Sequence, residues 1–310
     1  MTPLTAILRE EIERGGPITF HRFMDAALYH PEHGYYRQPR DPFGKDGDFF
    51  TAAQLQPVFG ILIAARIQSL YREMGEPAGF TVVELGPGRG EMAEALDNIK
   101  FVPLGADLPE RFEGVVFSNE FFDSLPVHRV VWIDGEPRDS MVGWRDGRFI
   151  WVDGPPATGE IRDYVERYFP ESPGRMSAEV NLDAVRWMER ISESLERGYV
   201  FTIDYGYTAA ESIRFPAGTL MSYRRHTATE DVLADPGGRD ITAHVCFPAL
   251  EGRGLKTRRF ETLARTLLDA GEADQFAAAL GGPDDARRRL QLKTLMFGMG
   301  ETFRTLLQEK

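Results

Sequence analysis

The stretch Thr81-Val82-Val83-Glu84-Leu85-Gly86-Pro87-Gly88-Arg89-Gly90-Glu91 decides the fold of this chain. Its first half is a short β-branched and apolar run, which predicts a buried strand, and glycines follow at alternate positions. The residues from Glu91 to Leu96 predict the start of a helix. A strand, a glycine turn and a helix open a nucleotide-binding α/β fold. Glycine suits the turn because it tolerates positive φ and lets a ligand approach the backbone closely.

The spacing of the glycines indicates which ligand binds there. A dinucleotide fingerprint needs G-x-G-x-x-G, but Glu91 occupies the position of its third glycine. A dinucleotide-dependent oxidoreductase is therefore the weakest of the candidate functions. The observed pattern, acid-x-G-x-G-x-G, is similar to the first motif of S-adenosylmethionine (SAM) methyltransferases. The simpler alternative is a glycine turn that only joins the strand to the helix.

Composition limits the class of protein. The chain has 310 residues, a net charge of −12 and a pI near 5.1, and its mean hydropathy is −0.32. The acidic balance argues against a nucleic-acid binder, which would carry a basic face. The single cysteine, Cys246, rules out an intrachain disulfide. Because the N-terminus has no signal-like apolar run and Val58 to Ile67 is too short to span a bilayer, we expect a cytoplasmic protein without a membrane partner.

Periodicity places other elements around the glycine turn. Helices are expected from Leu4, from Phe20 after a Thr19 cap, over Gln54 to Met74, over Leu182 to Leu195, over Phe260 to Leu280 and over Asp285 to Met296. Strands are expected at 114–117, 127–133, 141–152 and 198–206, with a last strand at 301–307. We therefore predict an α/β, Rossmann-like sheet. A helical and loop extension would cover residues 1–75, and the core would cover residues 76–310 with an inserted cap at about 208–295.

Several motifs, taken in order, resemble one family over nearly the whole chain. They are Pro17-Ile18-Thr19-Phe20, Gly34-Tyr35-Tyr36, Gly47-Asp48-Phe49-Phe50-Thr51, the glycine motif, Asn119 to Val127, Asp204-Tyr205-Gly206 and Asp240-Ile241-Thr242-Ala243-His244-Val245. The chain is identified by them as a member of the MidA-like SAM-dependent methyltransferases. The resemblance implies SAM as cofactor and symmetric dimethylation of an arginine in a protein substrate. It also implies a link to complex I assembly through the mitochondrial members.

The residue types fit this chemistry. Methyl transfer is a displacement in which positioning dominates. An arginine acceptor is a planar cation that carboxylates can hold, and Glu120 and Asp123 follow a predicted strand end. With Asn119 they are the predicted catalytic residues, although turn and capping chemistry is an alternative for them. Glu84, Gly86, Gly88 and Gly90 would seat the cofactor, and by resemblance Asp48 would reach over it.

Other polar residues carry weaker signals. Asp204 ends a predicted buried strand, where a structural acid is as good an interpretation as a catalytic one. His244 is better read as hydrogen-bonded structure than as a base. The six histidines have no metal-ligand spacing, so no metal site is predicted.

The chain departs from the family at two places. Relatives have a second strand, ending in an acid that binds the ribose hydroxyls, and then a helix. Here a short interval separates Gly90 from Val115, which leaves room for one short strand, and Asp107 is the substitute ribose ligand. Cys246 stands where relatives carry an acid. The rival hypothesis is therefore a catalytically impaired member that acts as a binding or assembly factor. The sequence leaves the substrate protein and the oligomeric state open.

Overall fold

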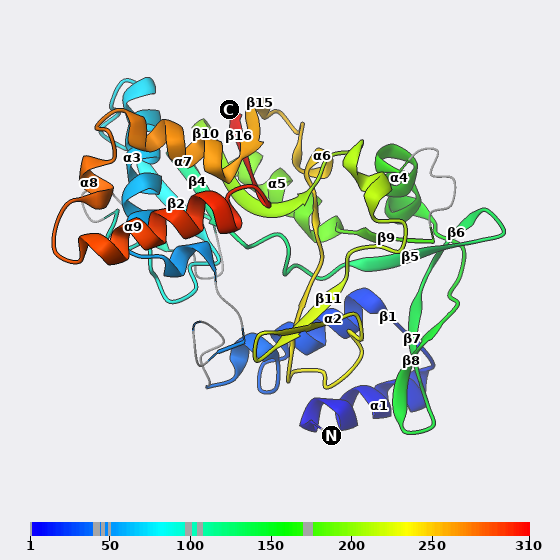
Figure 1. Ribbon diagram of the computed structural model, residues 1–310. Helices are drawn as coiled ribbons and strands as arrows, with labels where there is room; N and C mark the ends of the chain where they lie inside the picture. Colours follow the sequence, from blue (N-terminus) through cyan, green and yellow to red (C-terminus); the bar gives the residue numbers. More distant parts are fainter. Residues whose placement is uncertain are drawn as a thin grey trace. The chain divides into compact units, whose positions relative to one another are not determined.

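The computed structural model describes residues 2–39, 44, 47–48, 51–96, 101–103, 108–169 and 176–310. The chain folds into two compact units (Figure 1). The N-terminal unit comprises residues 1–50, 123–185 and 207–249, and the sheet unit comprises residues 51–122, 186–206 and 250–310. This division differs from a boundary near residue 75, because residues 123–185 associate with residues 1–50. Strand pairing shows why: Ile18 lies opposite Val142 in an antiparallel ladder.

The sheet unit is built on one open sheet. Its strands are β2 (Thr81–Leu85), β3 (Phe101–Pro103), β4 (Phe112–Asn119), β10 (Leu195–Tyr207), β15 (Lys256–Thr262) and β16 (Phe303–Glu309). They lie in the order β15-β16-β10-β4-β2-β3. Strands β3, β2, β4 and β10 are parallel to one another, whereas β16 is antiparallel to β10 and β15 to β16. The predicted α/β fold with a parallel sheet and a closing C-terminal strand is confirmed.

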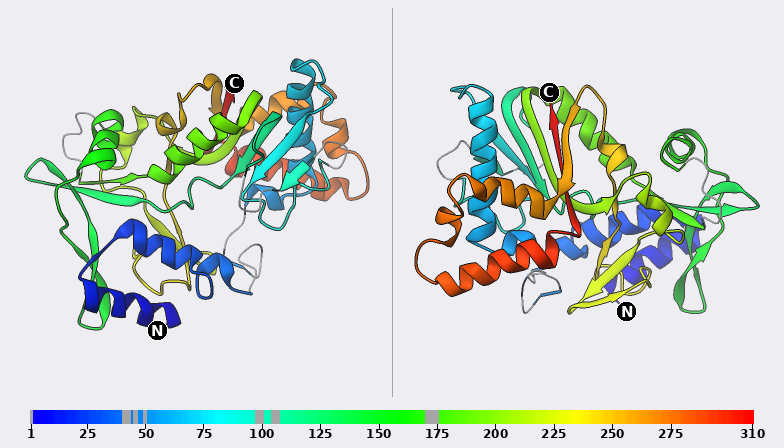
Figure 2. Two further views of the ribbon diagram at one scale, coloured as in Figure 1. Left: turned by 180° about the vertical axis from the view of Figure 1, so that it is seen from behind. Right: turned by 45° about the horizontal axis from the view of Figure 1, so that its top comes forward.

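One face of this sheet carries the main hydrophobic core. Val82 is in register with Val115, and Phe117 with Phe201, so their side chains point to the same face. Helices α3 (Val58–Glu73) and α7 (Leu263–Glu272) pack their apolar side chains against that face. Figure 2 shows the sheet between α3 and α5 (Leu182–Ser194). The remaining helical segments assigned to this unit are η2 (Ala52–Gln54), α8 (Ala277–Leu280), α9 (Asp285–Lys293) and the π-helix η4 (Thr294–Met299).

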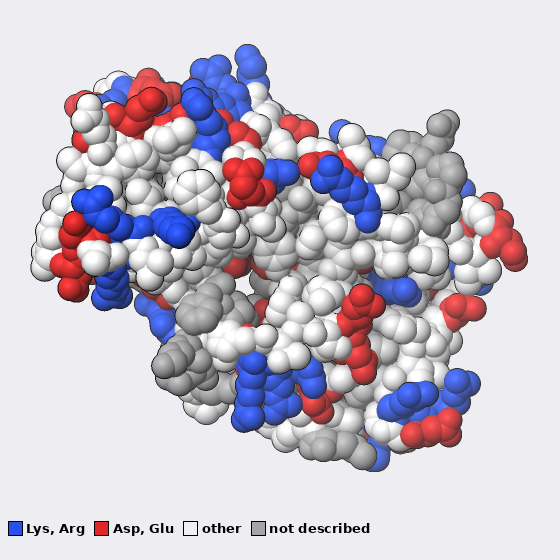
Figure 3. All heavy atoms as spheres, in the orientation of Figure 1, with Lys and Arg blue, Asp and Glu red and all other residues white. Residues whose placement is uncertain are grey.

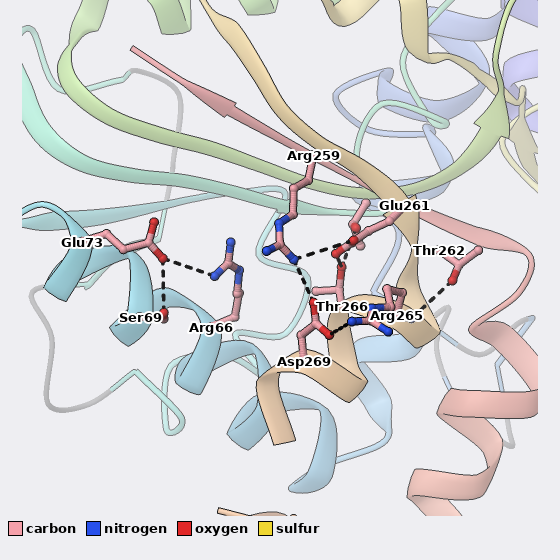
Figure 4. A network of polar contacts seen from close by, with 10 residues as sticks. Arg66, Ser69, Glu73, Arg259, Glu261, Thr262, Arg265, Thr266 and Asp269 are labelled. Carbon is pink, nitrogen blue, oxygen red and sulfur yellow. Dashed lines mark hydrogen bonds and ion pairs between the residues drawn. The ribbon is translucent and has the colours of Figure 1, made fainter. Parts of the chain in front are cut away.

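The helix expected from Phe260 begins instead at Leu263, because Phe260 belongs to strand β15. The hydroxyl of Thr262 accepts the backbone N–H of Arg265 at 3.3 Å and so caps the helix. The Asp269 carboxylate forms ion pairs with Arg259 from the strand and with Arg265 from the helix, each at 2.8 Å (Figure 4). These contacts fix the strand-to-helix corner, which local periodicity does not reveal.

The helix expected directly after the glycine turn is also corrected. Residues 91–96 form consecutive turns rather than an α-helix, and residues 97–100 lie outside the described chain. Leu96 donates its N–H to both Met92 O at 3.1 Å and Ala93 O at 3.3 Å, which is a bifurcated turn. Met92 and Leu96 are nevertheless buried in the main core. The spacing of the apolar residues therefore predicts correctly that Met92 and Leu96 are buried, although this segment is not a regular helix.

Short elements make up the N-terminal unit. Its helices are α1 (Pro3–Gly15), α2 (Phe20–Tyr29), η1 (Tyr35–Arg37), α4 (Gly159–Tyr168) and η3 (Glu211–Arg214), and α6 (Phe247–Leu250) follows its last strand. Its strands are β1 (Ile18–Thr19), β5 (His128–Ile133), β6 (Glu136–Asp139), β7 (Met141–Arg145), β8 (Arg148–Val152), β9 (Ser177–Val180), β11 (Met221–Arg224), β12 (Thr227–Thr229), β13 (Asp240–Thr242) and β14 (Val245–Cys246). Strand β14 pairs with β10, and the other described strands of this unit form three small sheets, in the orders β1-β7-β8, β6-β5-β9 and β12-β11-β13.

The predicted beginnings of the first two helices are confirmed. Thr2 caps α1 by accepting the N–H of Thr5 at 3.3 Å, and Thr19 caps α2 by accepting that of Arg22 at 3.1 Å. Their apolar faces form a second hydrophobic core with strands β7 and β13. Leu8 of α1, Val142 of β7 and Ile241 of β13 all belong to it. The segment after Thr208, expected to be an insertion, forms the β12-β11-β13 sheet of this unit.

Three further features concern the surface charge, the length of the helices and the clustering of possible metal ligands. On the face shown in Figure 3, basic and acidic side chains are interspersed and do not form one continuous basic field. None of the helices in the described ranges is long and apolar enough to cross a membrane. No cluster of three or more His, Cys, Asp or Glu side chains suited to a metal occurs in that part of the chain either.

Candidate active site

The turn after β2 is a succession of left-handed backbone positions. Gly86, Gly88 and Gly90 have φ values of 61°, 55° and 78°. The N–H of Gly90 donates to Pro87 O at 2.7 Å and closes the turn. These φ values are costly for residues with a Cβ, so the alternate glycines allow the chain to leave the sheet edge without strain.

Glu84 precedes this turn on a fully buried strand. The residue is 5% exposed, and its Oε2 atom is buried without a hydrogen-bond partner among the described residues. Burial, together with the charge of Glu91, raises the pKa of Glu84 to about 7. A buried acceptor that lacks a donor is unfavourable, so this position suits a ligand that brings a hydrogen-bond donor.

The end of β4 carries a carboxylate that is held in place. Glu120 adopts a left-handed conformation with φ of 53°, and its N–H donates to Ile203 O at 3.0 Å. Its Oε1 accepts the side-chain amide of Asn119 and the backbone N–H of Ala52, both at 3.0 Å. A non-glycine residue at positive φ is uncommon and often marks a functional position. The carboxylate of Glu120 is thus fixed before any substrate arrives.

Asn119 and Glu84 bring two unsatisfied acceptors to one place in the sheet. The Nδ2 atom of Asn119 donates to Glu120, and its Oδ1 atom is buried without a hydrogen-bond partner in the part of the chain that the structure describes. Glu84 is in register with Phe117, two residues before Asn119, so both side chains lie on the same face of neighbouring strands. SAM carries an ammonium group and two ribose hydroxyls, all hydrogen-bond donors. The residues at this edge therefore fit the cofactor.

Asp204 anchors the chain after Glu120. It is fully buried, its Oδ2 accepts the N–H of Phe122 at 3.0 Å, and its Oδ1 accepts the N–H of Tyr205 at 2.9 Å. Of the two interpretations that the sequence left open, these contacts support the structural one. Asp204 joins the end of β10 to the turn that presents Glu120.

An aromatic side chain lies against the glycine turn. The ring of Phe121 is so close to Gly86 that a Cβ there would lie 2.9 Å from Phe121 Cδ2. Trp187 of α5 meets Phe121 edge-on, with ring centroids 5.3 Å apart, and Arg190 lies over Trp187. The turns after β2 and β4 are thus packed together through one ring.

The other predicted site residues are not all in the sheet unit. Asp123 and Asp48 belong to the N-terminal unit, and Asp107 lies outside the described residues. Asp48 is 1% exposed and accepts Tyr35 Oη and the N–H of Arg225, each at 2.8 Å. These contacts tie its loop to the β11–β12 hairpin, which supports a structural role. The predicted roles of Asp48, Asp107 and Asp123 toward cofactor or acceptor stay predictions.

The sequence did not single out a polar cluster around Asp123. Tyr36 Oη donates to Asp240 Oδ1 at 2.9 Å, and Asp240 is only 2% exposed. Burial, and then the charge of Asp123, raises the pKa of Asp240 to about 7. The signal was present, since Asp240 begins the Asp-Ile-Thr-Ala-His-Val motif. Burial lowers the pKa of His244 in that motif, and its ring meets Phe215 edge-on.

Residues 93–264 match the sequence profile of a family of S-adenosyl-L-methionine-dependent methyltransferases. A protein named mitochondrial protein arginine methyltransferase NDUFAF7 homolog, from Drosophila melanogaster, is 28% identical, over 77% of this chain and 67% of that protein. The mouse protein of that name is 26% identical, over 92% and 80%. A protein from Burkholderia thailandensis whose crystal structure was solved with bound S-adenosyl-homocysteine is 30% identical with a TM-score of 0.87, over 99% of this chain and 92% of that protein.

Two expectations can be judged from these relatives. The predicted cofactor, SAM, is confirmed by the matched family and by the demethylated product bound in the Burkholderia structure. The predicted cytoplasmic location is wrong by the same comparison, since the fly, mouse and human relatives are all named mitochondrial. An N-terminus without a signal-like run was too weak a basis for assigning a compartment.

Proposed function

This chain belongs to the family of S-adenosyl-L-methionine-dependent methyltransferases, and from that membership we propose that it methylates an arginine side chain of a protein. The resemblance to the MidA-like family is thereby confirmed at the level of the family. The proposal about arginine takes its support from the names of the NDUFAF7 relatives and from the fixed carboxylate of Glu120. Symmetric dimethylation is the form of product that the resemblance implies.

Glu120 is the residue that carries the proposal. A guanidinium group is planar, and a carboxylate can hold two of its N–H groups at once. Holding the positive charge on one side of the group leaves the opposite nitrogen more nucleophilic. Asn119 and the N–H of Ala52 keep the Glu120 carboxylate from turning, because both donate to its Oε1 atom. In this proposal Asp123 also helps to orient the acceptor.

The cofactor supplies a methyl group activated on a sulfonium. Gly86, Gly88 and Gly90 bear no side chains of their own, so in this proposal they let the cofactor approach the backbone of the turn away from the Phe121 ring that packs on Gly86. Glu84, on the strand before them, offers a buried acceptor oxygen to the donors of the cofactor. Positioning of donor and acceptor groups is the main contribution that such a site makes to the rate.

A second candidate function is a binding or assembly factor without catalysis. The observation that favours it is the short sheet: within the described residues β3 pairs with β2 alone, and no strand continues the sheet beyond β3. Relatives of the resembled family have a further strand–helix unit there. A missing ribose ligand would lower the affinity for the cofactor by about a hundredfold.

One experiment separates these functions. The purified protein is titrated with S-adenosyl-homocysteine by calorimetry, and it is incubated with methyl-labelled SAM and a cell extract whose proteins are then hydrolysed. Labelled dimethylarginine supports the proposal, and label on lysine or another residue would contradict the arginine assignment. Failure of the folded protein to bind the product at millimolar concentration would favour the non-catalytic factor.

A matched pair of variants tests the role of Glu120. Glu120→Gln keeps the shape of the side chain but removes the charge, so methyl transfer should fall by about a hundredfold or more. Affinity for S-adenosyl-homocysteine should stay within about twofold, because Glu120 is assigned to the acceptor. Glu94→Gln makes the same chemical change at an exposed position of the sheet unit and should leave the rate unchanged. Full activity in Glu120→Gln would refute this role.

A further inference from the structure

A glutamine in the short η2 segment has an unused donor. The side-chain oxygen of Gln54 accepts the N–H of Thr51 at 3.2 Å. Only the oxygen of a primary amide can accept, so this contact fixes the orientation of the amide group. Its Nε2 atom is buried and donates to no group in the described chain. A buried N–H group without an acceptor is rare enough to require an explanation.

The short η2 segment that carries Gln54 is bonded to the residue that follows β4. Ala52, two residues earlier, donates its N–H to Glu120 Oε1, the atom that also accepts Asn119 Nδ2. The methyl group of Ala52 belongs to the same core as Phe117 and Ile203, the apolar residues around Asn119 in the sheet. The segment that carries Gln54 is therefore attached directly to the turn that carries Asn119 and Glu120.

The unsatisfied atoms around this turn are complementary in kind. Among the described residues, Glu84 Oε2 and Asn119 Oδ1 are acceptors without donors, and Gln54 Nε2 is a donor without an acceptor. A ligand that satisfies all three carries both hydrogen-bond donors and a hydrogen-bond acceptor. The α-ammonium and α-carboxylate of an amino acid form such a pair, and SAM and its product end in that group.

We propose that Gln54 binds the α-carboxylate of the amino-acid portion of the cofactor, opposite the acceptors Glu84 and Asn119. This inference rests on the proposed function, because it assigns one end of the same cofactor site. It adds a ligand from a segment before the glycine motif, outside the parallel strands. The amino-acid end would then be held by a hydrogen-bond donor on one side and acceptors on the other.

The test uses two ligands that differ in this end alone. S-adenosyl-homocysteine has the amino-acid portion, whereas 5′-methylthioadenosine keeps the nucleoside and sulfur but lacks it. Gln54→Glu retains an oxygen for Thr51 N–H and replaces the donating nitrogen by a second oxygen. Calorimetry should show affinity for S-adenosyl-homocysteine reduced by about tenfold or more, and affinity for 5′-methylthioadenosine unchanged. Gln68→Glu, the same change at an exposed position of α3, is the control and should alter neither affinity.

Gln54→Met removes the donor without adding a charge, so it separates the lost hydrogen bond from repulsion by the new carboxylate. It should reproduce the selective loss of affinity for S-adenosyl-homocysteine. Equal losses for both ligands would show that Gln54 only supports the fold, and no loss for either would refute its role as a ligand. If the unaltered protein binds neither ligand, the proposed function fails and this inference fails with it. Normal binding by the unaltered protein with unaffected variants refutes the Gln54 assignment alone.

Discussion

Phe121 lies against Gly86 with no room for a side chain between them, because a Cβ on Gly86 would be 2.9 Å from the Phe121 ring. Gly86 also has φ of 61°, in the left-handed region. Two separate causes thus require glycine at this position, one in the backbone and one in the neighbouring ring. The alternating glycine motif of the sequence is, at its first position, a packing requirement as well as a turn requirement.

Gly86→Ala should destabilise the protein more than Gly90→Ala. Gly90 also has positive φ, but its added Cβ would meet no atom of the described residues within 4 Å. Alanine at Gly90 should cost about 1–2 kcal/mol of unfolding free energy for the left-handed backbone. At Gly86 the contact with Phe121 should add about 1–3 kcal/mol. Urea denaturation of both variants measures the difference, and equal losses would show that the ring moves aside freely.

Asp204 should be essential for stability, since it receives two backbone N–H groups in a fully buried place. Asp204→Asn leaves one acceptor oxygen and turns an NH₂ group toward a donor. The unfolding free energy should fall by about 2–3 kcal/mol. Asp146→Asn, at an exposed turn of the N-terminal unit, should change it by less than about 0.5 kcal/mol. An Asp204→Asn protein with unchanged stability but no activity would point instead to a catalytic role.

Local patterns were sufficient for the centre of the sheet. The buried runs that became β2, β4 and β10 are continuous and apolar, as in strands covered on both faces, and the cap at Thr19 has a direct chemical signal. The strand β15 does not show the alternating pattern of a strand, because its exposed residues Lys256, Arg258 and Arg259 are charged and two of them are consecutive. What makes it a strand is its ladder with β16, which is a non-local contact.

The site was predictable in part for the same reason. Glu84, Asn119 and Glu120 stand at the ends of recognisable strands, so their place at one sheet edge follows from topology. Which segments of the chain make up each unit does not follow from the sequence, because it depends on long-range strand pairings such as that of Ile18 with Val142. Gln54 was not identified because its sequence context is an ordinary capping segment. Only the buried, unsatisfied amide in three dimensions marks it.

The affinity for S-adenosyl-homocysteine should rise with pH near neutrality. Because the pKa of Glu84 is raised to about 7 by burial and by Glu91, its carboxyl is mostly protonated at pH 6 and mostly ionised at pH 8. An ionised acceptor binds an ammonium donor more strongly, so affinity should increase by about tenfold over this interval. Calorimetry at both pH values tests this, with Glu84→Gln expected to remove the pH dependence. A pH dependence that persists in Glu84→Gln would assign the titration to another group.

The raised pKa of Glu84 has the opposite effect on the stability of the free protein: the unfolding free energy falls as the pH rises, whereas the affinity for the cofactor product increases. The folded pKa of Glu84 lies above its ordinary value of 4.5, so the folded state holds the proton more tightly than the unfolded state. The contribution of this group to stability is complete below pH 4.5 and is lost as the pH rises toward 7. Glu84→Gln should therefore reduce the fall in unfolding free energy between pH 5 and pH 7, as measured by urea denaturation. An unchanged fall would show that burial does not raise this pKa.

Two tyrosines of the N-terminal unit provide a paired test of the Asp240 carboxyl. Tyr36 donates to Asp240, whose pKa is raised to about 7, whereas Tyr29 donates to the carbonyl oxygen of Ser124 at 3.0 Å. Tyr36→Phe should cost about 1.5–3 kcal/mol at pH 8, where Asp240 is ionised, and about 0.5–1.5 kcal/mol at pH 5.5, where it is protonated. Tyr29→Phe should cost the same at both pH values, because a carbonyl does not titrate. Urea denaturation at the two pH values gives the unfolding free energies of both variants. Titration of other groups affects both variants alike and cancels in the comparison. An equal cost for Tyr36→Phe at pH 5.5 and pH 8 would mean that Asp240 does not change its charge in this interval.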